Sequence, residues 1–391
     1  MASSSRNTRR EFLLAASGVL PGVAALQVAS KSSRDSRLIF SEGRIASLRL
    51  KNRLVRSATA ENAWRGTEMT EEGINLYRDL AAGGVGLIIT GYMAVMHAGR
   101  SSDLQTRIDD DRFIEALRRI PTAVHKTRKD CKVVAQIAHA GMQGQVTEPV
   151  GPTTTPWPST KAKPRALTTR EVQETVANFA QAARRAKEAG FDGVEIHGAH
   201  GYLISSFLSP YTNTRTDQYG GSTEKRVAIV REIVEQARKL VDPDFPILIK
   251  MNCDDLAEGG VDILSFPPLA NEIERAGVQA VEVSGNNPIR EKFSGSEDQS
   301  YFLKYTQRLT LKVPVILTGG NRSAERLEQT AKAGMPQFFG FARPLIREPG
   351  LPARGKEGRG APEADCISCN RCIRGFAKGM FTRCRVTDLN L

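Results

Sequence analysis

The sequence predicts an α/β protein, a (β/α)8 TIM barrel with a short C-terminal cysteine-rich extension, and three observations support this fold class. Eight short apolar runs alternate with stretches of helical periodicity along the 391 residues. A unit of helix, Ala-Gly stop and strand occurs three times, as "AKEAGFDGVEIHG", "IERAGVQAVEVSG" and "AKAGMPQFFGFAR". No G-x-G-x-x-G follows the first predicted strand, which disfavours a dinucleotide-binding Rossmann domain.

The predicted strands are short and mostly apolar, as in a parallel sheet that is buried on both faces. They are Arg53–Ser57, Gly86–Thr90, Lys132–Ile137, Gly193–His197, Ile247–Asn252, Ala280–Ser284, Val315–Thr318 and Gln337–Phe341. The predicted helices between them are Glu71–Ala82, Asp111–Lys129, Thr169–Ala189, Thr223–Leu240, Pro267–Ala276 and Ser323–Ala333. The glycine of each Ala-Gly stop is typical of a helix C-cap.

Three segments are expected along the chain. Residues 1–33 have the layout of a twin-arginine export signal, with Arg9-Arg10 before an apolar stretch of small residues. The alternatives for this segment are a disordered basic tail and an ordinary Sec signal. Residues 34–350 form the barrel and residues 351–391 the extension. With the signal in use the protein would be periplasmic or otherwise exported; without it, cytoplasmic. We expect no transmembrane span after processing.

The overall charge of the chain is positive. The formal net charge is +12, yet aromatic residues make up only 6% of the chain and no basic cluster is interleaved with them, so we expect no nucleic-acid partner. A phosphorylated cofactor or an ordinary solvated basic surface accounts for the charge. Whether the chain forms a homo-oligomer is left open by the sequence.

Polar side chains and glycines gather at the carboxyl ends of the predicted strands, the edge where TIM-barrel enzymes build their sites. These residues are Gln136, His139, His197, His200, Tyr202, Lys250, Asn252, Thr318, Gly319, Gly320, Ala342 and Arg343. Glycine N–H groups after strand seven and a guanidinium after strand eight suit a phosphate. We therefore expect a phosphorylated ligand at this rim, with the Pro- and Thr-rich segment 142–169 as an active-site loop.

Six motifs resemble those of the old yellow enzyme family of FMN-dependent NAD(P)H:flavin oxidoreductases. They are "LKNRLVRSATAE", "GGVGLIITGYMAV", "VAQIAHAG", "HGAHGYLISSFLSPYTNTRTDQYGGS", "PVILTGGNRS" and "GFARPLIREP". The resemblance runs from about Leu38 to Pro349, and the long strand-four motif is highly specific. The FMN cofactor is implied by this resemblance alone, whereas the barrel follows from the periodicity.

The resemblance implies catalytic roles for three residues. His197 and His200 match the pair that hydrogen-bonds the carbonyl oxygen of an α,β-unsaturated substrate, or the oxygen of a phenol-type ligand. Polarising this oxygen draws electron density from the β-carbon, where hydride from the reduced flavin can add. Tyr202 matches the acid that protonates the α-carbon. The implied enzyme passes hydride from NAD(P)H or another donor to an activated alkene.

The flavin-binding residues implied by the resemblance come from several strand ends. Gln136 and Lys250 match residues at the pyrimidine edge of the flavin, where a cation near N1 stabilises its reduced anion. The segment beside the isoalloxazine ring comes from strand one, and the other expected contacts come from strands two, seven and eight. These residues are Ala58, Thr59, Ala60, Gly91, Gly319, Gly320, Ala342 and Arg343.

Two positions depart from the family pattern. Ala60 replaces a Thr or Cys that often hydrogen-bonds the flavin, and Met142 stands where an Arg is common. The resemblance therefore implies the reaction class more firmly than it implies the reduction potential of the flavin or the preferred ligand. In the loop after the proton donor, Arg215, Asp217 and Gly221 are expected to have a structural role.

Four of the six cysteines crowd into the extension with the spacing C-x2-C-x2-C-x11-C. Cys366, Cys369, Cys372 and Cys384 resemble the [4Fe–4S] segment of dienoyl-CoA and enoate reductases, although three residues separate the second and third ligands there and two do here. Four thiolates also suit a zinc site with four cysteine ligands, and metal-free thiols or disulfides are the third alternative.

Two other functions compete with the ene-reductase interpretation. Dienoyl-CoA-reductase or amine-demethylase chemistry with an Fe–S relay is one, although longer relatives perform it with an extra domain that we do not expect here. A non-redox barrel that binds a phosphorylated ligand is the other. A flavin spectrum would exclude only the second.

Overall fold

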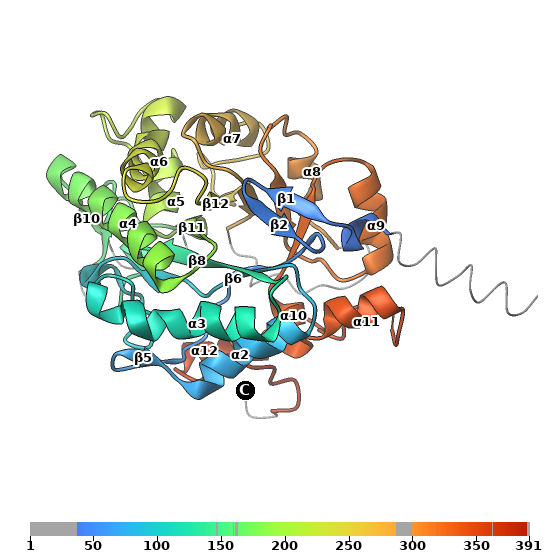
Figure 1. Ribbon diagram of the computed structural model, residues 1–391. Coiled ribbons are helices and arrows are strands. Elements are labelled where there is room, and N and C mark those ends of the chain that lie inside the picture. Colours follow the sequence, from blue (N-terminus) through green and yellow to red (C-terminus); the bar gives the residue numbers. More distant parts are fainter. Residues whose placement is uncertain are drawn as a thin grey trace, which may run out of the picture.

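The computed structural model describes residues 37–145, 148–158, 160, 163–286, 299–361 and 363–388, and the predicted export signal lies outside them. Among these residues eight parallel strands close into a barrel, in which β15 pairs with β3 and β8 with β11, and the helices surround the strands (Figure 1). The strands are β3 (Leu54–Arg56), β6 (Leu87–Ile89), β8 (Lys132–Ala138), β11 (Gly193–Gly198), β12 (Ile247–Asn252), β13 (Val281–Ser284), β14 (Val315–Thr318) and β15 (Phe338–Phe341). The predicted (β/α)8 fold is confirmed.

The predicted element positions agree closely with the structure. Each barrel strand begins and ends within one residue of its predicted bounds. The six predicted helices are α2 (Glu71–Ala82), α3 (Ile114–Thr127), α4 (Thr169–Ala189), α6 (Thr223–Arg238), α7 (Phe266–Arg275) and α9 (Ala324–Lys332). The first residues of the second predicted helix form a separate 3-10 turn, η3 (Asp111–Phe113), before α3 starts.

Several short elements were not predicted. A two-stranded hairpin, β1 (Gly43–Ile45) and β2 (Leu48–Leu50), precedes the barrel, and β4 (Trp64–Arg65) pairs with β5 (Glu68–Met69). Short helices follow several strands and form the extension. They are α5 (Leu203–Leu208), α8 (Leu303–Thr306), α10 (Arg343–Arg347), α11 (Leu351–Glu357) and α12 (Arg371–Ala377). The remaining short pieces are β7 (Met93–Ala94), β9 (Val150–Gly151), β10 (Arg165–Ala166), η1 (Leu38–Phe40), η2 (His97–Gly99) and η4 (Gly141–Gln143).

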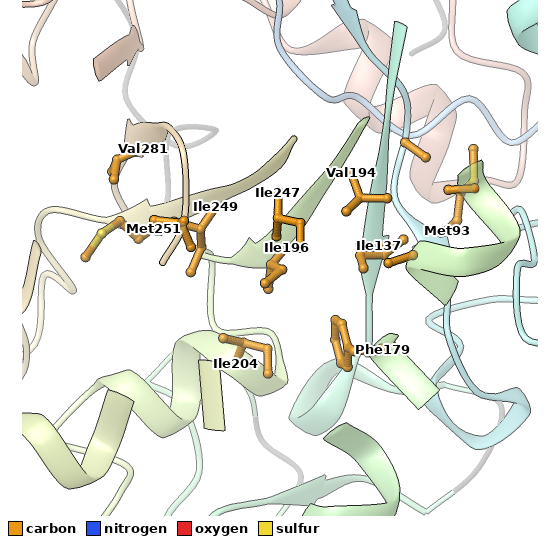
Figure 2. Packing of buried hydrophobic residues seen from close by; sticks show 14 of the residues in the cluster. Met93, Ile137, Phe179, Val194, Ile196, Ile204, Ile247, Ile249, Met251 and Val281 are labelled. Carbon is orange, nitrogen blue, oxygen red and sulfur yellow. The ribbon is translucent and has the colours of Figure 1, made fainter. Parts of the chain in front are cut away.

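Two apolar layers form because successive side chains of a strand point to opposite faces. Inside the barrel, Val134 packs with side chains of the β1–β2 hairpin, such as Ile45. Outside, Ile196 packs with Phe179 of α4 and Ile204 of α5 (Figure 2). The hairpin side of the interior is filled with apolar side chains, so the polar residues at the carboxyl ends of the strands are left to form a site.

The cysteine-rich extension packs on the barrel. Its first helix begins beside α2, where the Ala353 N–H donates to the Gly83 carbonyl at 3.0 Å. Further along, the Asn62 side chain donates to the carbonyls of Phe376 and Met380, at 2.8 and 3.2 Å. No helix in the described part of the chain is long and apolar enough to cross a membrane.

Candidate active site

A cavity of about 510 Å³ lies at the carboxyl ends of the barrel strands. Most of the predicted site residues line it together. These are Ala58, Thr59, Ala60, Gln136, His197, His200, Tyr202, Lys250, Gly319, Gly320, Ala342, Arg343 and, from the extension, Cys372. Residues separated by more than 300 positions in the chain thus meet in one site.

Gly91 is a predicted flavin-binding residue that does not line this cavity. Its N–H donates to Glu61 Oε1 at 2.6 Å, and Tyr77 also hydrogen-bonds that carboxylate oxygen. A Cβ on Gly91 would lie 2.1 Å from Glu61 Oε2, so only glycine fits here. Through Glu61, Gly91 therefore stabilises the segment that follows the first barrel strand.

The two histidines lie at the end of β11: His197 within the last residues of the strand and His200 in the turn after it. Their ring centroids are 5.3 Å apart and the rings are perpendicular. His200 has a φ of 61°, and its N–H donates to Asn252 Oδ1 at 2.9 Å, which holds this unusual backbone conformation. Its Nε2 lies 2.9 Å from Ser284 Oγ.

Both histidines are neutral at physiological pH. Burial, reinforced by the nearby Lys250 ammonium, lowers the pKa of His197 to about 3 and holds that of His200 well below its usual range. His197 Nδ1 accepts the Ala199 N–H at 3.3 Å, so the proton of the neutral ring is assigned to Nε2. The pair can therefore donate hydrogen bonds to an oxygen atom without carrying charge.

Tyr202 lies at the start of α5 and belongs to the same aromatic cluster. Its ring centroid is 4.6 Å from that of His197 and 5.4 Å from that of Tyr92. Burial raises the pKa of Tyr202 well above its usual value, so its hydroxyl keeps its proton at neutral pH. The Tyr92 hydroxyl hydrogen-bonds that of Tyr202 and lies 2.8 Å from Ser101 Oγ.

Tyr92 was not among the predicted site residues, although it stands in the motif "GGVGLIITGYMAV" at the end of the second barrel strand. It lines the cavity and is only partly exposed. Its position directly after a barrel strand was the signal that could have identified it. The sequence alone gives no sign that its hydroxyl reaches Tyr202.

One end of the cavity carries glycines and arginines. Gly319 and Gly320 have φ values of 129° and 73°, which favour glycine, and they follow β14 as predicted. Asn321 then donates to the carbonyls of Leu317 and Gly340, at 2.7 and 2.9 Å, and so ties β14 to β15.

Two arginines line this end of the cavity. Arg343 Nη1 donates to Asn370 Oδ1 of the extension at 2.5 Å. Arg322 was not predicted; its Nη2 donates to the Ala364 carbonyl at 3.0 Å, and its buried Nε has no partner among the described residues. Arginine donors and left-handed glycines together form an anion-binding environment.

Among its described residues, part of segment 142–169 borders the cavity, as expected of an active-site loop. Gln143 and Thr160 line the cavity, and the Gln143 side chain donates to the His200 carbonyl. Trp157 packs against Gly201, where a Cβ would lie 2.9 Å from the indole ring. Met142 is buried and does not line the cavity.

The expected structural role of the loop after Tyr202 agrees with its contacts. Arg215 forms an ion pair with Asp217 at 2.5 Å and donates to the Pro152 carbonyl at 3.0 Å. The hydrogen bond with Arg215 lowers the pKa of Asp217 to about 2. Arg215 thus ties this loop to segment 142–169.

The four cysteines of the extension border a second, small cavity of about 20 Å³. Cys372 and Arg343 border both cavities, so the two are adjacent. Burial raises the pKa of the Cys372 thiol to about 11. In the described part of the chain no group of three or more His, Cys, Asp or Glu side chains is arranged to hold a metal ion, and all six cysteines are free thiols.

Comparisons with curated proteins point to one family. The NADH oxidase of Thermoanaerobacter brockii is 36% identical over 365 residues, which cover 90% of this chain and 56% of that protein. The metal reductase of Desulforamulus reducens is 35% identical over 344 residues, covering 85% and 51%. The 4,4'-dithiodibutanoate disulfide reductase of Rhodococcus erythropolis is 31% identical over 392 residues, covering 90% and 95%. The chain spans about half the length of the first two relatives.

Solved structures agree with this result. A 2-naphthoyl-CoA reductase has a TM-score of 0.81 at 25% identity, with 89% of this chain and 56% of that chain covered. Morphinone reductase has a TM-score of 0.71 at 25% identity, with 84% and 92% covered. The family model described as NADH:flavin oxidoreductase / NADH oxidase matches residues 39–361. The chain therefore belongs to this family of FMN-dependent oxidoreductases, the old yellow enzyme family.

Proposed function

We propose that the protein is an FMN-dependent oxidoreductase of the ene-reductase type, which takes hydride from NAD(P)H and passes it to an activated alkene such as an enone. The observation that carries this proposal is the set of His197, His200 and Tyr202 on one cavity, with two neutral imidazoles beside a protonated phenol. Family membership and the NADH oxidase relative support the flavin and the nicotinamide donor.

The residues of the cavity fit FMN. A volume of about 510 Å³ is within the range of small-molecule sites. Gly320, Arg322 and Arg343 would hold the phosphate, and the unpartnered Arg322 Nε is a donor available to it. Lys250 and Gln136, at the ends of their strands, would meet the polar edge of the ring. When bound, FMN would supply hydride exchange between donor and acceptor.

The protein side chains would then polarise the substrate and supply a proton. His197 and His200 would donate hydrogen bonds to the carbonyl oxygen, which withdraws electron density from the conjugated β-carbon. Tyr202 would give its hydroxyl proton to the α-carbon, so its O–H bond breaks as the new C–H bond forms. All three groups are neutral at physiological pH. Their interaction with the substrate therefore strengthens only as negative charge develops on it during the reaction.

Half-reaction kinetics test this proposal. Tyr202→Phe should leave flavin reduction by NAD(P)H near the wild-type rate and slow reoxidation by an enone about 10²–10⁴-fold, because only that step needs the proton. Tyr211→Phe, which follows α5 and does not line the cavity, is the matched control. A purified protein without a flavin spectrum refutes the proposal. Reduction by an amine, with no response to NAD(P)H, favours amine-demethylase-like chemistry instead.

We further propose that the extension holds a [4Fe–4S] cluster, with Cys366, Cys369, Cys372 and Cys384 as ligands. Support comes from the spacing of the cysteines and from their shared border on one small cavity next to the flavin site. Anaerobic iron and sulfide analysis tests it, with about four of each expected per chain. Zinc without sulfide would identify a zinc site with four cysteine ligands, and neither metal would leave free thiols.

A matched pair of variants separates ligand loss from general damage. Cys369→Ser should lower the iron content, whereas Cys131→Ser should not, because Cys131 is buried beside α3 and far from the extension in sequence. Equal iron loss in both variants would contradict the ligand assignment.

For localisation, we propose export through the twin-arginine route, on the basis of Arg9-Arg10 and the apolar residues after them. Fractionation of cells expressing the chain tests this. Replacing both arginines by lysine should retain the protein in the cytoplasm; export of that variant at the wild-type level would refute the proposal.

A further inference from the structure

Three ionisable side chains from adjacent strands are buried inside the barrel, below the cavity. Glu195 belongs to β11, Lys250 to β12 and Glu282 to β13, and they are 0%, 3% and 0% exposed. Lys250 and Glu282 are direct partners in the parallel register of their strands. Only Lys250 among the three lines the cavity itself.

The two carboxyl groups have very different surroundings. Glu282 Oε1 accepts two hydrogen bonds, from Ser57 Oγ at 2.6 Å and from Thr318 Oγ1 at 2.7 Å, and forms an ion pair with Lys250 Nζ at 3.0 Å. Lys250 also donates to Ser57 Oγ at 2.8 Å, so the ammonium, the hydroxyl and the carboxylate form a closed triangle.

Glu195 has far fewer partners. Its Oε2 accepts one hydrogen bond, from the Gln136 amide at 2.7 Å. Its Oε1 and the second oxygen of Glu282 accept no hydrogen bond from any other described residue and are fully enclosed, and the two carboxyl groups hydrogen-bond each other. Lys250 is the cation that pairs directly with Glu282, and the buried Arg56 adds a Coulombic attraction to Glu282, so the partners favour Glu282.

Two carboxylates that share one buried cation cannot both ionise without a large cost. Burial, followed by repulsion from Glu282, raises the pKa of Glu195 well above its usual range. Burial alone would raise the pKa of Glu282 as well, but Lys250 and the hydrogen bonds to this carboxylate outweigh it and lower the pKa. Glu282 thus carries the negative charge and Glu195 keeps its proton.

We propose that Glu282 is a positioning residue that fixes the Lys250 ammonium at the floor of the cavity and offsets its charge, and so lowers the reduction potential of the bound flavin. This inference rests on the proposed FMN function. A bare lysine beside the flavin would stabilise the reduced anion by its full charge. The ion pair reduces that stabilisation, which makes the reduced flavin a stronger hydride donor. Glu195 is a neutral neighbour that can take up the negative charge if Glu282 loses it.

Three glutamine variants test the charge assignment, because each keeps the shape of the side chain. The midpoint potential of the FMN-loaded protein is measured by equilibration with redox dyes. In Glu195→Gln the potential should stay close to that of the wild type, since a neutral acid is replaced by a neutral amide. In the double variant Glu195→Gln/Glu282→Gln, Lys250 is unpaired, and the two-electron reduction equilibrium should shift about tenfold or more toward the reduced form, about 30 mV.

The single variant Glu282→Gln should fall between these limits, because Glu195 can ionise in its place. An unchanged potential in the double variant overturns the proposal. A shift of the midpoint potential in Glu195→Gln that is as large as the shift in Glu282→Gln also overturns the proposal.

Failure of the proposed function is recognised separately, by a wild-type protein that does not retain FMN. The ion pair can then be measured in the flavin-free chain. There Glu282→Gln should lower the midpoint temperature of thermal unfolding more than Glu195→Gln, because Lys250 loses its direct ion-pair partner and Glu195 must ionise, at a cost, in its place. Equal effects of the two variants would refute the assigned charges.

Discussion

Replacing His139 by asparagine should make the stability of the protein less sensitive to acid. His139 follows β8 and is 4% exposed, and its Nδ1 accepts the Gly141 N–H at 3.0 Å. Burial lowers the pKa of His139 to about 4, whereas an imidazole in an unfolded chain has a pKa of about 6.5. The stabilising contribution of the neutral ring is therefore complete above about pH 6.5 and is lost as the pH falls toward about 4.

Proton linkage gives the size of the effect. Between about pH 7.5 and about pH 5 the unfolded imidazole titrates over roughly 1.5 pH units while the folded ring stays mostly neutral, at about 1.4 kcal/mol per unit. The protein should lose about 2 kcal/mol of its free energy of unfolding from this group. In His139→Asn the new amide oxygen can still accept the Gly141 N–H, but no group titrates there.

Urea unfolding of wild type and variant at these two pH values measures the difference. The free energy of unfolding lost on acidification should be about 2 kcal/mol smaller in His139→Asn. Gly99 packs against the His139 ring, so the variant should also be less stable at neutral pH, and only the change with pH is diagnostic. His97→Asn, at an exposed position, is the control. An equal acid-dependent loss in His139→Asn and wild type refutes a buried neutral imidazole.

Three further predictions concern the site and the extension that packs on the barrel. Tyr92→Phe removes the hydroxyl next to Tyr202, so reoxidation of the flavin by an enone should slow by about tenfold or more. Reduction by NAD(P)H should stay near the wild-type rate. Stopped-flow rates that fall equally in both half-reactions would contradict this. Arg343→Ala should weaken FMN binding by about 1.5–3 kcal/mol in a fluorescence titration, and unchanged affinity would exclude a phosphate contact. Asn62→Ala removes two hydrogen bonds to the extension, which should then be cleaved faster in limited proteolysis, whereas the surface variant Asn178→Ala should not change cleavage.

Helix boundaries could be predicted because their signals are local. Helix α4 begins with a capping box, in which the Thr168 side chain accepts the Glu171 N–H and the Glu171 carboxylate accepts the Thr168 N–H. It ends at Gly190, whose φ of 92° is accessible mainly to glycine. Each of these interactions joins residues a few positions apart, so the residue types alone identify them.

The short hairpin before the barrel could not be predicted in the same way. Its strands, β1 and β2, have three residues each, too few to show a clear periodicity. They are stable because Ile45, Leu48 and Leu50 pack into the barrel interior. That packing exists only after all eight strands have closed.

The candidate site was predictable in part. His197, His200, Tyr202 and Lys250 were identified from strand ends and from the long strand-four motif, and all four line one cavity. Tyr92 was missed because its hydroxyl contact to Tyr202 joins segments that follow two different barrel strands, and neither the strand pattern nor the motif encodes that distance.

The sequence by itself determined the eight strands, the helices between them and the residues at each carboxyl end, because the alternation of apolar runs and helix stops is written along the chain. Only the tertiary structure decided which buried charges compensate each other. Ser57 and Glu282 are 225 positions apart, yet their side chains lie 2.6 Å apart. This contact depends on closure of the barrel, which brings β3 to face β13 across its interior. The charge of Lys250 at the cavity floor is therefore a property of the closed barrel and not of any one segment.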